Sequence, residues 1–344
     1  MPNVTVRDVA AHAGVSRATV SRVLNNNPTV DAALRERVVE AVRELGYQPN
    51  RMARRLRSQT SSVIGLIVSD IQNPYFISII KGVEDVAYAH QMSIILCNSD
   101  EDPAKEQMYL RVMAAERVAG LVIVPSQNSD THNLAQLQQM GIPVTLLDRF
   151  MPDVEMDVVK VDNERGAYDA VLHLAVLGRR RIAIITGVLS LTTGRERYSG
   201  YQMALASSGL PHDLSLVKEG DFKAESGYRL TRELLTSTPP PDALFVSNNM
   251  MTLGALRALR EMAVRVPQQI ALVGFDDMPW SGDLYSPLTA VSQPTYELGT
   301  EAVNLLLRRL ANPASPFRTV MLQPRLIVRE SCGAALRSAH YDDK

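Results

Sequence analysis

The 344-residue chain contains little cysteine and tryptophan, and this scarcity narrows the classes of protein to consider. Its two cysteines, Cys97 and Cys332, lie far apart and lack the spacing of a metal site. We therefore expect both cysteines to act as small hydrophobic residues of a protein in a reducing compartment, because a disulfide framework needs more cysteines. The sequence also lacks a signal peptide pattern and an apolar run of membrane-spanning length, which predicts a cytoplasmic protein.

Lysine is absent from residues 1–60, and the charge of this segment differs from that of the rest of the chain. The segment holds ten arginines and five acidic residues, a net charge of +5, whereas residues 61–344 carry 26 basic and 32 acidic residues, a net charge of −6. The overall charge of −1 conceals this division. A basic N-terminal module is the pattern expected for binding to nucleic-acid phosphates.

The sequence lacks the short motifs of common enzyme classes. It has no phosphate-binding GxxxxGK[ST] loop, no GxGxxG after a strand, no GxSxG elbow and no paired histidines at helical spacing. The six histidines are scattered. We therefore expect no catalytic residue, cofactor or metal, and predict that the protein is not an enzyme.

Residues 5–24 have the pattern of two short helices joined by a tight turn. Thr5 and Asp8 form a capping pair, Gly14 permits a sharp reversal, and Ser16 caps the second helix. Apolar residues face inward at helical spacing, which leaves a polar face on the second helix made of Arg17, Ala18, Ser21 and Arg22. This pattern predicts a helix-turn-helix whose second helix enters the DNA major groove. An αα-hairpin that only packs is the alternative, and the local positive charge argues against it.

Two further helices are expected before residue 60. Asp31 caps a third helix, which ends at Gly46 and completes a small three-helix core. Residues 50–58 fit a short helix capped by Asn50, with four arginines within residues 51–57. A helix this short is unstable alone, so we expect DNA to support it.

With 46% hydrophobic residues, the rest of the chain is long enough for two further domains. Short β-rich runs alternate with amphipathic segments after the polar stretch 58–62, which indicates parallel βαβ units. The first series of strands is expected at Val63–Ser69, Ser93–Asn98, Gly120–Pro125 and Pro143–Leu147, and the second at Arg181–Thr186, Ala243–Ser247 and Ile270–Gly274. Helices are expected near 164–177, 195–208, 224–236 and 250–263. The fold class is therefore α/β: an all-α N-terminal headpiece followed by two doubly wound parallel-sheet lobes.

Aromatic and hydrogen-bonding residues gather just after the expected strands. Ligands in doubly wound sheets bind beyond the carboxyl ends of the strands, and two facing lobes create a cleft there. Aromatic faces pack on sugars or flat bases, while Arg, Asp and Asn engage hydroxyls or carboxylates. The candidate effector-binding residues are Tyr75, Phe76, Asp148, Thr193, Arg197, Phe222, Asn248, Asp276, Trp280 and Gln293.

Residues 5–58 resemble the headpiece of the lactose/galactose repressor (LacI/GalR) family of bacterial transcription regulators. The resemblance rests on Asp8-Val-Ala10, Ala13-Gly-Val-Ser16, Thr19-Val-Ser-Arg-Val-Leu-Asn25 and Leu45-Gly-Tyr-Gln-Pro-Asn50, followed by Ala53 and Leu56. It implies that Arg17, Ala18 and Arg22 read bases and that Leu56 wedges into the minor groove. The candidate DNA-binding residues are Thr5, Ser16, Arg17, Ala18, Thr19, Ser21, Arg22, Asn25, Asn50, Ala53, Arg54, Leu56 and Arg57.

The resemblance continues through almost the whole chain and implies periplasmic-binding-protein-like lobes. The segments that match cleft positions of the family are Asn73-Pro-Tyr-Phe76, Thr192-Thr-Gly194 with Arg197, Gly220-Asp-Phe222, Ser247-Asn248 and Gly274-Phe-Asp276. There are two departures. The purine repressor carries Arg where this chain has Leu191, and many sugar-responsive members carry Asp where it has Asn249. The effector expected is therefore a monosaccharide or sugar acid.

The resemblance also implies discontinuous lobes, because the strand at Ala290–Pro294 and a helix near 295–310 are expected to return to the first lobe. The predicted division is a headpiece (1–48), a hinge helix and linker (49–61), an N-terminal lobe (62–162, with about 291–321), a C-terminal lobe (163–290, with about 322–332) and a tail (333–344). The function expected is a dimeric repressor that binds palindromic operator DNA under effector control. The alternatives are a solute-binding protein and a doubly wound enzyme with a DNA-binding head.

Overall fold

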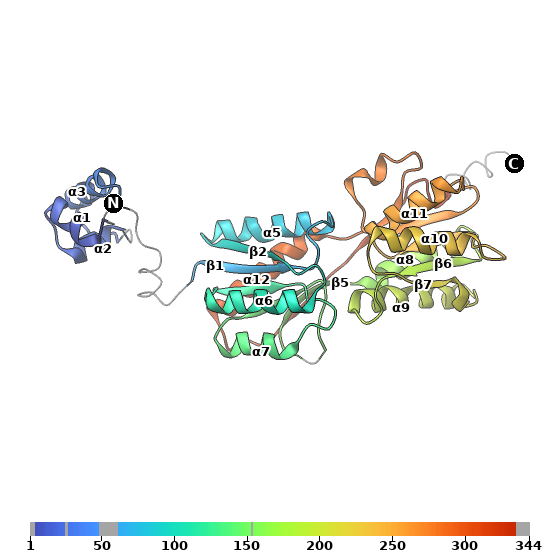
Figure 1. Ribbon diagram of the computed structural model, residues 1–344, viewed down its shortest axis with the longest axis horizontal. Helices are drawn as coiled ribbons and strands as arrows, with labels where there is room; N and C mark the ends of the chain where they lie inside the picture. Colours follow the sequence, from blue (N-terminus) through green and yellow to red (C-terminus); the bar gives the residue numbers. More distant parts are fainter. Residues whose placement is uncertain (1–3, 25–26, 48–60, 153, 335–344) are drawn as a thin grey trace. The chain divides into compact units, whose positions relative to one another are not determined.

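The computed structural model describes residues 4–24, 27–47, 61–152 and 154–334. The chain divides into two compact units, residues 1–61 and 62–344 (Figure 1). The expected helix at residues 50–58 lies outside the described residues, and so do six of the candidate DNA-binding residues: Asn25, Asn50, Ala53, Arg54, Leu56 and Arg57.

Within residues 4–24 and 27–47, the first unit has three helices around a small apolar core, as predicted: α1 (Val6–Ala13), α2 (Arg17–Leu24) and α3 (Ala32–Glu44). The capping pair before α1 is confirmed, because the Thr5 amide donates to the Asp8 carboxylate over 2.8 Å and the Asp8 amide donates to Thr5 Oγ1 over 3.4 Å. Gly14 ends α1 in the left-handed region at φ 64°. The turn that the sequence predicts therefore has its expected backbone.

The caps of the next two helices are also confirmed. Ser16 Oγ accepts from the Thr19 amide (3.1 Å) at the start of α2, and the Asp31 carboxylate accepts from the Ala33 amide (3.0 Å) at the start of α3. The Arg37 guanidinium donates to the Ala13 carbonyl over 2.7 Å and so ties α3 to the turn.

The N-terminal lobe of the second unit has three layers. Its six strands are all parallel in the order β11-β5-β4-β3-β1-β2. Helices α5 and α12 pack on one face and α6 and α7 on the other. The elements are β1 (Val63–Val68), α5 (Tyr75–Ala89), β2 (Ser93–Asn98), α6 (Pro103–Ala115), β3 (Gly120–Ile123), α7 (Thr131–Gln139), β4 (Val144–Leu147), β5 (Asp157–Val161), α12 (Thr295–Ala311) and β11 (Thr319–Leu322).

The C-terminal lobe repeats this architecture in the order β12-β10-β9-β8-β6-β7, with β12 antiparallel to its neighbour. Helices α8 and α9 cover one face of the sheet and α10 and α11 the other. The elements are α8 (Asn163–Val176), β6 (Ile182–Thr186), α9 (Thr192–Ser207), the 3-10 turn η1 (Leu214–Leu216), β7 (Val217–Glu219), α10 (Ala224–Leu235), β8 (Ala243–Val246), α11 (Asn249–Glu261), β9 (Ala271–Phe275), the 3-10 turn η2 (Pro279–Gly282), β10 (Thr289–Ser292) and β12 (Arg325–Ile327).

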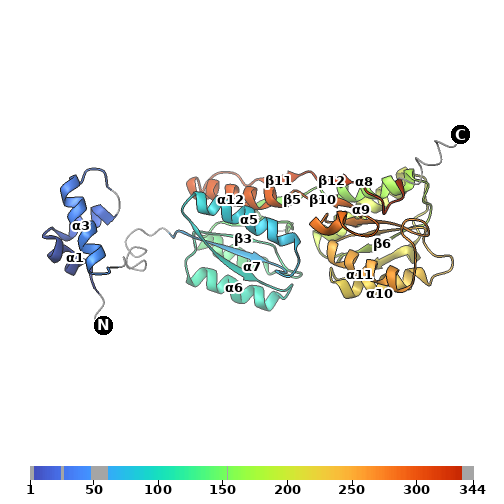
Figure 2. The same cartoon turned by 90° about the horizontal axis from the view of Figure 1, so that it is seen from above.

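The chain crosses between the lobes three times: after β5, after β10 and between β11 and β12. Figure 2 shows these four strands along the same side of the two lobes. The expected return to the first lobe is correct for α12, which packs on α5, but wrong for the strand. Strand β10 pairs with β9 in the C-terminal lobe, where Ala290 and Val291 are completely buried. The chain passes to the N-terminal lobe only after this strand, at Gln293.

The strands of both expected series form, with ends shifted by one or two residues. Four strands were not predicted: β5, β7, β11 and β12. Strands β7, β11 and β12 are three or four residues long and only partly buried, so any apolar run in them is short. None of the helices in the described ranges is long and apolar enough to cross a membrane.

Candidate functional site

A cavity of about 480 Å³, part of it open to solvent, lies between the two lobes where the carboxyl ends of their strands meet. Nine of the ten candidate effector-binding residues line it. The exception is Trp280, which lies in η2 and packs against the core of the C-terminal lobe. The lining residues are Ser69, Asp70, Asn73, Tyr75, Phe76, Glu101, Asp148, Arg149, Thr193, Arg197, Asp221, Phe222, Lys223, Asn248, Asp276 and Gln293.

Four lining residues have left-handed backbones within three residues of the end of a strand. Glu101 follows β2 at φ 59°, Asp148 follows β4 at 66°, Phe222 follows β7 at 64° and Asp276 follows β9 at 72°. Asp tolerates this region better than most residues, but a phenylalanine there costs about 1–3 kcal/mol. Such conformations cluster at ligand sites. The repeated conformation therefore points to a functional site.

Two buried carboxylates from opposite lobes lie at the floor of the cavity and share a hydrogen-bond network. The Tyr75 hydroxyl donates to Asp148 Oδ1 over 2.8 Å and lies 3.4 Å from Gln293 Oε1, and the Gln293 amide donates to Asp276 Oδ1. Burial raises the pKa of both Asp148 and Asp276. The positive charges of Arg149 and Arg197 oppose the shift at Asp148, and that of Arg197 opposes it at Asp276. The fold holds the two carboxylates in place although burial removes part of their hydration, which is unfavourable for the ionised form. Such an arrangement is typical of a binding site.

Arg197 lies on α9 and its guanidinium is held by three contacts. Nε donates to Asn163 Oδ1 (2.8 Å), Nη1 donates to the Ser247 carbonyl (2.6 Å), and Cζ lies 3.8 Å from the centroid of the Phe275 ring. Within the described ranges, Arg197 forms no ion pair with an acidic residue, and its Nη2 has no hydrogen-bond partner. The guanidinium therefore has a donor free for a ligand.

Aromatic rings and a second arginine complete the wall. Phe222 is held beside Gly187, where a Cβ would lie 2.0 Å from its ring. The Arg149 guanidinium lies 5.9 Å from the Phe222 ring centroid and pairs in bidentate fashion with Glu101 over 2.7 and 2.8 Å. Arg149 is paired with Glu101, and its Nε also lies 3.8 Å from Asp148 Oδ2, whereas Arg197 has no carboxylate partner among the described residues.

Seven of the lining residues are not among the candidates selected from the sequence: Ser69, Asp70, Asn73, Glu101, Arg149, Asp221 and Lys223. Asn73 and Asp221 do stand in segments that match cleft positions of the family, and Asp70 lies two residues after the end of β1. No local sequence pattern indicated the pairing of Arg149 with Glu101, because 48 residues separate them. Asn248, which was selected, caps α11 through the Met251 amide (2.9 Å) and donates to the Phe222 carbonyl (3.1 Å), so it also positions the aromatic wall.

The headpiece has an exposed polar face on α2. Arg17, Ala18 and Arg22 are exposed, and Ser21 is half-buried. The side chains of Thr5, Ser16 and Thr19 contribute to the helix caps. The residues expected to read bases therefore face solvent rather than the headpiece core.

Comparison with known proteins agrees with this architecture. Residues 5–50 match the family of bacterial regulatory proteins of the lacI type, and residues 171–332 match a periplasmic binding protein-like domain. The chain is 37% identical over 336 residues to the HTH-type transcriptional repressor PurR of Haemophilus influenzae (strain PittEE), covering 96% of this chain and 99% of the relative.

Solved structures resemble almost the whole chain. The Lac repressor dimer bound to operator and the anti-inducer ONPF is 30% identical with a TM-score of 0.86, and 96% of this chain and 99% of that chain are covered. The transcriptional regulator CelR in complex with cellobiose is 34% identical with a TM-score of 0.73, and 96% of this chain and 100% of that chain are covered. The family consists of transcriptional repressors rather than enzymes. From its headpiece to its two-lobed core, this chain belongs to the lacI family of bacterial regulatory proteins.

Proposed function

We propose that the protein represses carbohydrate-metabolism genes by binding a palindromic operator as a homodimer, under the control of a small sugar in the interlobe cleft. A protein whose partner is operator DNA works in the cytoplasm. The proposed division is headpiece 1–48, hinge 49–61, two lobes that exchange segments near 291 and 322, and a tail from 333. No metal or cofactor takes part in this proposal.

The observation that carries the effector proposal is the arrangement of polar groups around the cavity. Asp148 accepts from the Tyr75 hydroxyl and Asp276 from the Gln293 amide, and both carboxylates would accept further hydrogen bonds from sugar hydroxyls, while the free Nη2 of Arg197 would donate one. Tyr75 and Phe76 contact each other edge-on with centroids 5.0 Å apart and add apolar wall. Buried hydrogen-bonding groups of both kinds beside aromatic rings fit a polyhydroxylated ring.

Charge favours a neutral sugar over a sugar acid. The cavity is lined by five acidic and three basic side chains, a net charge of −2. Arg149 is shared between Glu101 and Asp148, and Lys223 is paired with Asp70, so Arg197 is the lining cation that forms no ion pair with a described residue. An anionic ligand would meet repulsion from the carboxylates with only Arg197 to offset it.

The operator proposal rests on the exposed face of α2. Arg17, Ala18 and Arg22 would contact base edges, and a dimer would place two such helices on successive major-groove faces. Leu56 would wedge between base steps at the centre of the palindrome. Further contacts are proposed for Thr5, Ser16, Thr19, Ser21, Asn25, Asn50, Ala53, Arg54 and Arg57.

Effector control would act through the angle between the lobes. Both ends of the hinge segment are tied to folded units, so a change in lobe angle alters how two hinge segments approach DNA. A coupling free energy of about 1–3 kcal/mol is typical of such systems. It requires that the effector bind one lobe arrangement better than the other.

The Arg197→Ala variant tests the cleft. We expect a 10- to 150-fold loss of sugar affinity by isothermal titration, because a hydrogen bond to a charged group contributes about 1.5–3 kcal/mol. Operator affinity without sugar should stay near that of the parent protein. Arg229→Ala, which removes an exposed guanidinium from α10, is the matched control. Unchanged sugar affinity in Arg197→Ala would rule out this cleft as the effector site.

A further inference from the structure

The topology of the two sheets places the mouth of the cleft. The crossovers follow β5, β10 and β11, which lie at or next to one end of each sheet order, whereas β2 and β7 are the edge strands at the opposite ends. The lobes are joined by chain on the crossover side only. The cleft therefore opens on the side of β2 and β7.

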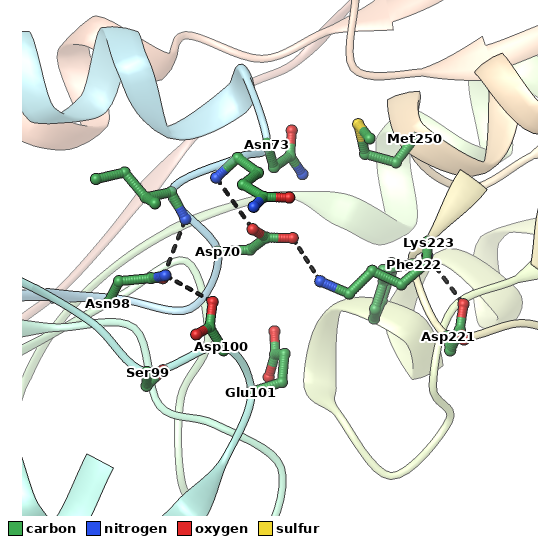
Figure 3. A network of polar contacts seen from close by, with 12 residues as sticks. Asp70, Asn73, Asn98, Ser99, Asp100, Glu101, Asp221, Phe222, Lys223 and Met250 are labelled. Carbon is green, nitrogen blue, oxygen red and sulfur yellow. Dashed lines mark hydrogen bonds and ion pairs between the residues drawn. The ribbon is translucent and has the colours of Figure 1, made fainter. Parts of the chain in front are cut away.

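An ion pair spans the gap between the lobes on that open side. Lys223, just after β7, places Nζ 2.5 Å from Oδ2 of Asp70, which follows β1, the neighbour of β2 (Figure 3). Both residues are fixed by local turns. Asp70 Oδ1 accepts from the Gln72 amide over 3.0 Å, and the Lys223 amide donates to Asp221 Oδ1 over 2.9 Å. The pair is therefore a defined contact between two anchored loops.

Burial separates the mouth of the cavity from its floor. Asp148, Arg197 and Asp276 are buried at the floor, while the side chains of Lys223 and Asp70 are 45% and 16% exposed. Two more interlobe contacts narrow the gap: Asn249 Nδ2 donates to Asn73 Oδ1 over 2.7 Å, and Gln127 Nε2 donates to Ser190 Oγ over 2.9 Å. The ion pair thus stands between the hydroxyl-binding groups and solvent.

We propose that the Asp70–Lys223 ion pair limits the size of the effector to a single sugar ring. This inference rests on the proposed function. A monosaccharide on Asp148, Arg197 and Asp276 leaves the pair intact, whereas the second ring of a disaccharide has to displace it. The related CelR was solved with cellobiose, so two-lobed architecture alone does not exclude two rings. The side chains at the mouth make the selection.

A partly exposed ion pair is weak enough to open for entry of a ligand. Its effect on selection is therefore steric: the pair and its two anchored loops occupy the space that a second ring needs. Two substitutions of Lys223 separate the effect of its side-chain volume from that of its charge. Methionine removes the charge and keeps the length of the side chain, while alanine removes both.

Isothermal titration on the full-length protein compares ribose, glucose and galactose with cellobiose, maltose and lactose. We expect the parent protein to bind at least one monosaccharide at least 100-fold more tightly than any of the disaccharides. Lys223→Ala should narrow this ratio at least tenfold through a gain in disaccharide affinity, and Lys223→Met should narrow it less. Lys218→Ala, which removes an ion pair within the C-terminal lobe, should leave the ratio unchanged.

Two results would overturn the size limit while leaving the sugar effector in place. One is a parent protein that binds a disaccharide within tenfold of its monosaccharide. The other is a Lys223→Ala variant that loses affinity for both classes equally, since the pair would then only clamp the lobes together. Absence of binding by all six sugars to every variant would instead overturn the proposed sugar effector, and the size limit with it.

Discussion

Asp148 combines a left-handed backbone, full burial and a hydrogen bond from Tyr75. Burial raises the pKa of this carboxyl, so the folded protein holds the proton more tightly than the unfolded chain does. The contribution of Asp148 to stability is therefore greatest below the ordinary carboxyl pKa of 3.8 and is lost as the pH rises through the raised value. At neutral pH the ionised group destabilises the fold.

Asp148→Asn should therefore stabilise the protein at neutral pH by about 0.5–2 kcal/mol while weakening sugar binding. Asparagine keeps an acceptor for Tyr75 and tolerates the left-handed backbone. Thermal denaturation between pH 7.5 and pH 4 should show the gain shrinking as the pH falls. Asp283→Asn, at an exposed carboxylate, should show no such gain. Equal stability of Asp148→Asn and the parent at every pH would contradict the cost assigned to Asp148.

Arg22 is the exposed arginine in the middle of the polar face of α2. Arg22→Ala should weaken binding to an operator selected from random sequences by about 1–3 kcal/mol if its guanidinium contacts bases. Fluorescence anisotropy on operator and scrambled duplexes measures this. Arg43→Ala removes the same charge from α3 and should weaken binding to both duplexes by the same factor. Equal losses on both duplexes for Arg22→Ala would reduce Arg22 to a phosphate contact.

At the scale of elements, the helix-turn-helix depends on the reversal at Gly14. A Cβ there would lie 2.7 Å from the Arg37 guanidinium, which holds the Ala13 carbonyl, and the left-handed backbone disfavours any side chain. Gly14→Ala should destabilise the headpiece by about 1–2 kcal/mol, through the backbone alone, plus the displacement of Arg37. Hydrogen exchange of headpiece amides in the full-length protein measures this loss.

Gly46→Ala provides the matched control for Gly14. Its φ is 59°, and nothing lies within 4 Å of the added Cβ, so this variant reports the backbone cost alone. Gly14→Ala should therefore increase amide exchange more than Gly46→Ala does. The reverse order would show that the Arg37 contact contributes nothing to the turn.

At the scale of the whole molecule, the proposed dimer needs an apolar surface. Strand β2 is a sheet edge, and exposed apolar side chains lie on it and on the helices that precede and follow it in the chain: Leu96 on β2, Ile77 and Tyr88 on α5, and Met108 and Val112 on α6. Sheet edges with exposed apolar residues are surfaces that proteins cover. A second copy of the chain would cover this one.

Leu96→Asp should therefore shift the protein toward monomer at micromolar concentration and weaken binding to a two-half-site operator. Sedimentation velocity measures the first effect and anisotropy the second. Met203→Asp places the same charge on an exposed apolar position of α9 and should leave the dimer intact. A Leu96→Asp protein that sediments as the parent does would exclude this edge as the interface.

The sequence by itself determined the features that depend on neighbouring residues. The caps at Thr5, Ser16 and Asp31, the turn at Gly14 and the strands of the two expected series are predicted correctly, because hydrogen bonds over three residues and apolar periodicity are local properties. The carboxyl ends of those strands also located nine cavity residues in advance.

Only the tertiary structure decided the features that join distant segments. Strand β5 begins at Asp157, whose buried carboxylate is paired with Arg308 and Arg309 of α12 some 150 residues later. The same holds for Arg149 with Glu101 and for Lys223 with Asp70. The tertiary structure also decides that Trp280 packs on the core of the C-terminal lobe rather than in the cavity, and that β10 joins the sheet of that lobe. Such pairs leave no periodic trace, because they form only after the fold has brought together segments that are distant in the sequence, within one lobe or between the two.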